Sequence, residues 1–133
     1  MTITPFIVAF AWSDTTGFGA KVANPASLPA GAGQGVAWSP DGAYVGLAHT
    51  TTPFQSIYPF TTGFGTRVTN PGTLPTGNAT RIRWNKAGTY VGITHATSPY
   101  ISVYPWSGGA YGAKVSDPAT TPTGTGRDLE WRT

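Results

Sequence analysis

The chain is 133 residues long, which predicts one domain with a core of its own and too little length for two. Its 18 glycines and 12 prolines predict many turns, and the 13% aromatic and 39% hydrophobic content excludes a disordered chain. Because the net charge of +3 comes from eight scattered Lys and Arg, we do not expect nucleic acid as a partner. The absence of cysteine excludes disulfides and thiolate metal sites.

The N-terminal stretch does not read as a targeting segment. Residues Met1 to Trp12 are partly apolar but lack a basic region and a small-residue cleavage site, so we expect no secretory signal. No apolar run approaches the ~20 residues that a membrane helix needs. We therefore expect a soluble protein that does not contact a membrane.

The sequence repeats itself at intervals of 46 and 47 residues. The segment FGAKVANPASLPAG begins at Phe18 and returns as FGTRVTNPGTLPTG from Phe64 and as YGAKVSDPATTPTG from Tyr111. A second series is TPFIVAFAW from Thr4, TPFQSIYPF from Thr52 and SPYISVYPW from Ser98. Three tryptophans recur at the same interval, and we expect them in the core: Trp38, Trp84 and Trp131.

Each copy predicts four short strands, because β-branched and apolar residues alternate with small or polar ones between clusters of Gly, Pro, Asn and Asp. The expected strands of the middle copy are Gly35–Ser39, Ala43–His49, Gln55–Phe60 and Phe64–Thr69. A Pro40-Asp41-Gly42 turn separates the first two. The hairpin before the fourth strand varies between copies, from Thr61–Gly63 to Ser107–Ala110 and Ser13–Gly17, as exposed loop tips do.

Proline-rich connections end each copy, because proline cannot donate to a strand ladder. The single domain, residues 1–133, therefore divides into a partial unit 1–30, whole units 31–76 and 77–123, and a partial unit 124–133. Four antiparallel strands followed by a crossover describe the blade of a β-propeller, so the predicted fold is all-β with propeller-type blades. The alternative is a β-trefoil or β-prism closed with pseudo-threefold symmetry.

The two chain ends do not coincide with a unit boundary. The chain opens just before a third-type strand and closes just after a first-type strand, so the split unit lacks the equivalent of Asp41–Ala48 and eleven strands are expected. Three blades are too few for a propeller ring, which has roughly four to eight. We therefore expect a homo-oligomer, for example a twofold dimer with six blades.

The run VAWSPDGAYVGLAH, with SPDG at Ser39–Gly42, resembles WD-repeat-like propeller blades. The NPxxLPTG-type connections and SPY-type strands also resemble repeats of phage virion and tail-associated proteins. This second resemblance implies a non-enzymatic structural or assembly role in the virion, as capsid decoration or part of a tail or fibre, with other virion proteins as partners. The alternative function is a multivalent, lectin-type module that binds glycans.

Two recurring sets of side chains are candidates for ligand or partner contacts. The aromatic set consists of Trp12, Phe60 and Trp106 at the ends of equivalent strands, with Tyr58 and Tyr104 two residues earlier. Such residues either pack between blades or stack on sugars. The basic set is Lys21, Arg67 and Lys114, which either blunt a sheet edge or form a ring for anions.

No constellation for catalysis stands out. His49 and His95 occupy equivalent positions in different units without a third ligand nearby, so we expect a structural role and no metal. The five acidic residues are spread over turns and the C-terminal segment, and no pair has the spacing for acid–base work. We expect no enzymatic activity and no cofactor.

Overall fold

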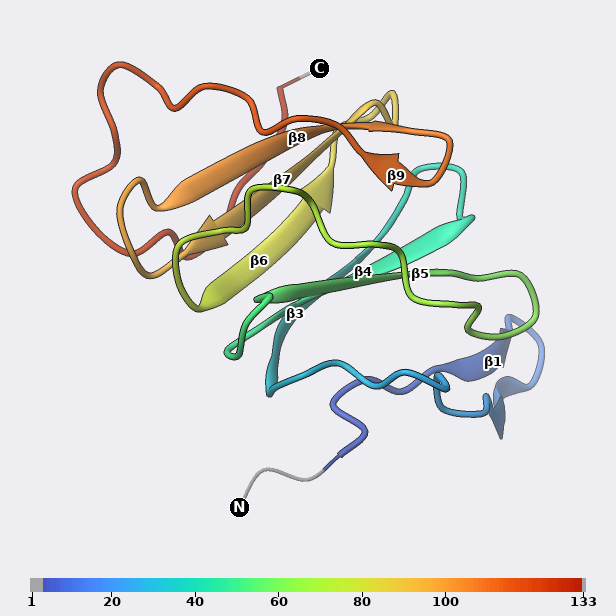
Figure 1. The fold of residues 1–133 in the computed structure, drawn as a ribbon. Coiled ribbons are helices and arrows are strands. Elements are labelled where there is room, and N and C mark those ends of the chain that lie inside the picture. The colour runs from blue at the N-terminus through green and yellow to red at the C-terminus, as the bar shows by residue number, and fades with distance from the viewer. Residues whose placement is uncertain (1–3, 133) are drawn as a thin grey trace.

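The computed structural model describes residues 4–132, which form nine β-strands in three antiparallel sheets and contain no helix. The sheets follow one another in chain order from the N-terminal to the C-terminal side of the molecule (Figure 1). Sheet 1 is a hairpin of β1 (Phe10–Ser13) and β2 (Gly17–Lys21). None of the described residues belongs to a helix able to cross a membrane.

Sheets 2 and 3 repeat one antiparallel meander. Sheet 2 contains β3 (Gly33–Trp38), β4 (Tyr44–His49) and β5 (Gln55–Pro59). Sheet 3 contains β6 (Ala79–Trp84), β7 (Tyr90–His95), β8 (Ile101–Ser107) and β9 (Ala110–Tyr111). The register is the same in both, because Trp38 pairs with Val45 and Trp84 with Val91. The predicted all-β class and the repeated strand order are confirmed.

The fourth strand of the middle copy is an exception, because the expected strand Phe64–Thr69 does not form. The segment keeps one bridge between Phe60 and Phe64, and the Val68 N–H donates to the Ile57 carbonyl at 2.8 Å. Proline explains the loss. The Pro59 carbonyl accepts the Gly65 N–H at 2.7 Å, so the backbone of Pro59 faces the outer segment, but proline has no N–H to donate in return. The ladder between β5 and the outer segment therefore lacks one hydrogen bond in its middle.

The other two copies support this explanation. Pro105 holds the same place in sheet 3, where β9 is only two residues long. Sheet 1 has Ala11 there, and β2 extends over five residues. The C-terminal residues 124–132 also form no strand, although the Gly126 N–H donates to the His95 carbonyl at 3.2 Å. The described residues therefore contain nine strands rather than the eleven expected.

The main core lies where sheets 2 and 3 pack face to face, and its cluster of buried residues includes Ile57 from β5 together with Ile82 and Trp84 from β6. A smaller cluster joins Ile7 to sheet 2 through Val45, Leu47 and Tyr58. A glycine permits the close approach of the two larger sheets: a Cβ atom on Gly46 of β4 would lie 2.9 Å from both Ile82 and Trp84. The repeat therefore creates a seam between sheets, with glycine on one side and tryptophan on the other.

The backbone also repeats ahead of each third-type strand. An aromatic residue there has a positive φ in all three copies, with 65° at Phe6, 68° at Phe54 and 69° at Tyr100. Bulky side chains rarely adopt this conformation. Its recurrence shows that the copies share local geometry as well as sequence.

Candidate interaction surface

In the seam between sheets 2 and 3, sheet 2 covers a group of aromatic side chains that belong to sheet 3. Tyr104 and Trp106 of β8 are 0% and 6% exposed, and Tyr111 of β9 packs edge-on against both. Tyr44 of β4 crosses the seam and meets the Trp106 ring at 5.3 Å, while Gly46 leaves room for Trp84. Sheet 2 thus supplies a tyrosine and a glycine, and sheet 3 supplies an aromatic cluster.

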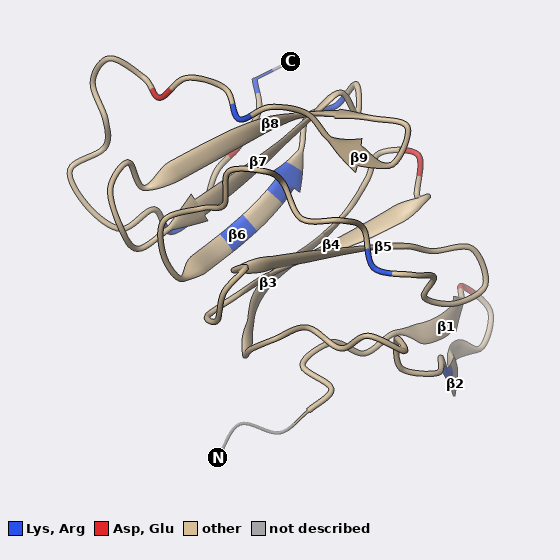
Figure 2. Ribbon diagram, viewed as in Figure 1, with Lys and Arg blue, Asp and Glu red and all other residues tan. Residues whose placement is uncertain are grey.

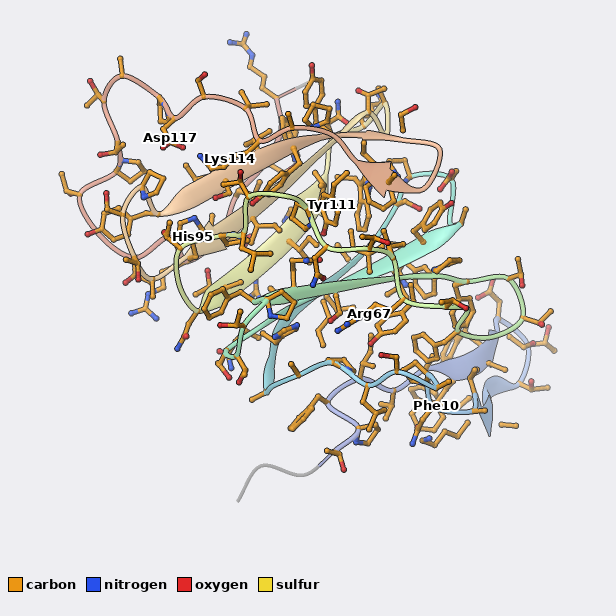
Figure 3. The ribbon with its side chains drawn as sticks, in the orientation of Figure 1. Phe10, Arg67, His95, Tyr111, Lys114 and Asp117 are labelled. Atoms are coloured by element: carbon orange, nitrogen blue, oxygen red, sulfur yellow. The ribbon has the colours of Figure 1, made fainter. Side chains whose placement is uncertain are left out.

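Sheet 1 carries the same aromatic cluster without a cover. Phe10, Trp12 and Phe18 are the counterparts of Tyr104, Trp106 and Tyr111 in the repeat. Trp12 meets Phe18 edge-on with centroids 5.3 Å apart, close to the 5.2 Å between Trp106 and Tyr111. Trp12 is 64% exposed and Phe18 is 79% exposed. We call Phe10, Trp12 and Phe18 the hairpin face; Phe10 is labelled in Figure 3.

Sheet 3 carries a second, partly covered copy of the other half of the seam. Tyr90, Gly92, Val103 and Val115 of its outward side correspond to the sheet 2 residues that pack on sheet 3, namely Tyr44, Gly46, Ile57 and Val68. Tyr90 is 40% exposed and Val115 is 41% exposed. We call this set of four the sheet 3 face. Part of it is covered, because Gly92 accommodates Trp131 from residues 124–132 as Gly46 accommodates Trp84.

The three tryptophans expected in the core have different surroundings. Trp84 is 7% exposed, Trp131 is partly buried against Gly92, and Trp38 is 50% exposed. Trp38 keeps one aromatic neighbour, Phe60, at 5.0 Å. Trp84 of sheet 3 is covered by β4 of the preceding sheet. The sheet that precedes Trp38 is sheet 1, whose described part has no strand equivalent to β4, so Trp38 remains exposed.

Tyr58 and Tyr104 are buried anchors. The Tyr58 hydroxyl donates to the Ser27 carbonyl at 2.6 Å, and the Tyr104 hydroxyl donates to the Thr73 carbonyl at 2.7 Å. Burial raises the pKa of both phenols, to about 12 for Tyr104. These two tyrosines therefore fix the proline-rich connections to the sheets and offer no surface for a ligand.

The basic set does not gather into one site. Lys21 donates to the Asn24 side chain at 2.5 Å, and Lys114 forms an ion pair with Asp117, which stands at the equivalent position. Arg67 lies over the middle of the molecule, apart from the Lys114–Asp117 pair (Figure 3). Two of the three cations thus close a local turn, which favours the structural explanation over a ring for anions.

An arginine pair that sequence reasoning did not single out lies on β6 (Figure 2). Arg81 and Arg83 reach Asp128 at 3.6 Å and 3.3 Å, and the Arg83 hydrogen bond is the main reason why the pKa of Asp128 is lowered. The two arginines also line a hollow of about 510 Å³ beside β3. Since Asp128 is more than half exposed, this pair attaches residues 124–132 to sheet 3 through solvent-screened contacts.

Each histidine pairs with a serine inside its own sheet. The His49 ring meets the Ser56 hydroxyl at 3.1 Å, and the His95 ring meets the Ser102 hydroxyl at 3.0 Å. Both rings are fully buried, and burial is the main reason why their pKa values are lowered. A nucleophile and base need access to substrate, which these buried pairs do not have.

No group of three or more metal-ligating side chains occurs among residues 4–132. No protein-family model matches the sequence, and no curated protein matches it. The candidate interaction surface consists of two apolar faces, the hairpin face and the sheet 3 face.

Proposed function

We propose that the chain is a non-enzymatic assembly module that acts through protein–protein contacts. One observation carries the proposal: the aromatic side chains of the hairpin face are exposed, whereas their counterparts on sheet 3 are covered in the seam between sheets 2 and 3. Contiguous apolar patches of this kind on a folded domain mark interaction sites. Aromatic residues are also the type that protein interfaces favour.

The proposed arrangement of the sheets is that of propeller blades. Its support is the face-to-face packing of sheet 2 on sheet 3 and the return of the same packing where Gly92 meets Trp131. A threefold-closed β-trefoil or β-prism does not predict one seam repeated along the row of sheets. The proposed setting is a virus particle, because the repeats resemble those of phage virion and tail-associated proteins.

Labelling of virus particles from the source organism tests this role. Antibody against the chain is expected to decorate a capsid, tail or fibre, and the chain is expected to co-purify with the particle. A Trp12→Ala variant should reduce particle incorporation, because Trp12 is the one tryptophan of the hairpin face and its side chain is largely exposed. A Leu28→Ala variant changes an exposed apolar residue that lies outside both faces, and it should not reduce incorporation. Absence of the chain from particles would refute the virion setting.

Glycan binding is the second candidate, because Trp12 is exposed and its indole N–H donates to the Asp14 carboxylate at 2.8 Å. An aromatic ring beside a carboxylate is a typical combination for sugar recognition. The equivalent residues Phe60 and Trp106 pack against Trp38 and Tyr44, so the support for glycan binding comes from Trp12 alone. A glycan array with the wild-type and Trp12→Ala proteins separates the two candidates, because only lectin activity predicts Trp12-dependent sugar binding.

A further inference from the structure

The hairpin face and the sheet 3 face are two halves of one interface. Within the chain, the counterparts of these faces meet in the seam, where Tyr44 packs on Trp106 and a glycine receives Trp84. The hairpin face preserves the geometry of its half, as the matching ring distances of its Trp12–Phe18 pair show. A surface that already has the shape of a buried one needs little rearrangement to bind the same partner shape.

We propose that a second copy of this chain covers the hairpin face with its sheet 3 face. This inference rests on the proposed function and names the partner. Trp12 of one copy packs on Tyr90 of the other, as Trp106 packs on Tyr44. It also lies beside Trp131 of that copy, as Trp106 lies beside Trp84 with ring centroids 5.6 Å apart. Each apolar face then gains the cover that its counterpart has inside the chain.

The contact joins unlike faces, so each copy offers one of each. Two copies joined by two such contacts close around a twofold axis. The closed pair contains six sheets, which lies within the roughly four to eight blades of propeller rings. The proposed interface consists of packed faces only. Residues 124–132 correspond to β6 and β1 corresponds to β8, but the described residues of neither copy provide a strand equivalent to β7 to pair between them.

Cysteine crosslinking can read this register, because the chain has no native cysteine. In the seam, Ala43 and Gly109 line one hollow of about 340 Å³. Thr89 is the counterpart of Ala43 on the sheet 3 side. The β1–β2 turn is one residue longer than the β8–β9 turn, and Thr16 takes the place of Gly109 because it directly precedes the paired residue Gly17, as Gly109 precedes Ala110. Thr16 and Thr89 are both exposed. Thr16→Cys and Thr89→Cys proteins are mixed, and a short bismaleimide is expected to give crosslinked pairs that contain one of each.

Controls separate this contact from other association. Either variant alone should give no crosslinked pair, and a Gly72→Cys protein, whose new side chain meets open space, should not crosslink to Thr16→Cys. Native mass measurement should give two chains for the wild type. Trp12→Ala should weaken the pair at least 10-fold while its melting temperature stays near that of the wild type, because Trp12 is largely exposed; Leu28→Ala should change neither.

The outcomes distinguish this inference from the proposed function. A single chain at every concentration, or a mass of three chains or more, would overturn the twofold pair. A pair that crosslinks Thr16→Cys to itself would overturn the head-to-tail register. In each of these cases the assembly role is still decided by particle labelling, which does not depend on self-association.

Discussion

Replacement of Gly46 by alanine tests how closely sheets 2 and 3 pack in the seam. The new Cβ would lie 2.9 Å from Ile82 Cδ1 and Trp84 Cη2 and 3.0 Å from Trp84 Cζ3. Ordinary carbon contacts lie at about 3.5–4.0 Å, so the sheets must separate by roughly half an ångström or more. Ile82 and Trp84 are both buried and packed on all sides, so neither can turn away.

Overpacking of a well-filled core costs about 1–3 kcal/mol of unfolding free energy. A domain of this length loses roughly 4 °C of melting temperature per kcal/mol, so we expect the Gly46→Ala protein to melt about 4–12 °C below the wild type. Gly92→Ala is the matched test at the second seam. Its Cβ would meet Leu129 Cδ1 at 2.5 Å, but Leu129 and Trp131 are partly exposed and can move, so we expect a loss below about 1 kcal/mol.

Thermal and urea unfolding followed by tryptophan fluorescence measure both effects. Gly72→Ala is the control, because its Cβ meets no atom within 4 Å, and it should leave stability unchanged or raise it by about 0.4–1 kcal/mol. A Gly46→Ala protein that melts with this control would refute close packing of sheets 2 and 3. A Gly92→Ala protein more damaged than Gly46→Ala would refute the loose attachment of residues 124–132.

Three further predictions concern the same elements. Trp84→Ala should cost about 3–5 kcal/mol of unfolding free energy in urea titrations and Trp38→Ala clearly less, since only Trp84 is buried; equal losses would contradict the difference between the seams. The lowered pKa values of His49 and His95 mean that the unfolded chain binds more protons below pH ~6.5, so stability should be full above that pH and fall with acidification, by at most about 1.4 kcal/mol per pH unit for each histidine. His95→Gln should reduce this slope, and an unchanged slope would assign it to other groups. Thr80→Val removes a hydroxyl that donates to the Gly126 carbonyl at 2.5 Å, so amide hydrogen exchange in residues 124–132 should accelerate with a loss of about 1 kcal/mol; unchanged exchange would show that this bond does not hold the segment.

The sequence determined the repeat, and through it the all-β class and the order of the strands. Alternation of apolar and small residues is a local property, and it placed β4 within one residue of the expected span Ala43–His49. The histidines were expected to be structural, and both are buried against a serine of the neighbouring strand. Equivalent residues of a repeat have equivalent neighbours only where the copies adopt the same structure. The repeated turns, strands and positive φ values show that the copies share their local structure.

Only the tertiary structure decided which copies of each residue are covered. Trp12 and Trp106 are indistinguishable by position in the repeat, yet one is largely exposed and the other buried, because burial depends on whether a neighbouring sheet supplies the opposite face. The same holds for Trp38 and Trp84. The role of Pro59 and Pro105 was also hidden, since the loss of an outer strand depends on which side of β5 or β8 their missing N–H would face. The repeat can be read from the sequence of the chain, whereas the burial of a residue depends on which neighbouring sheet packs against it.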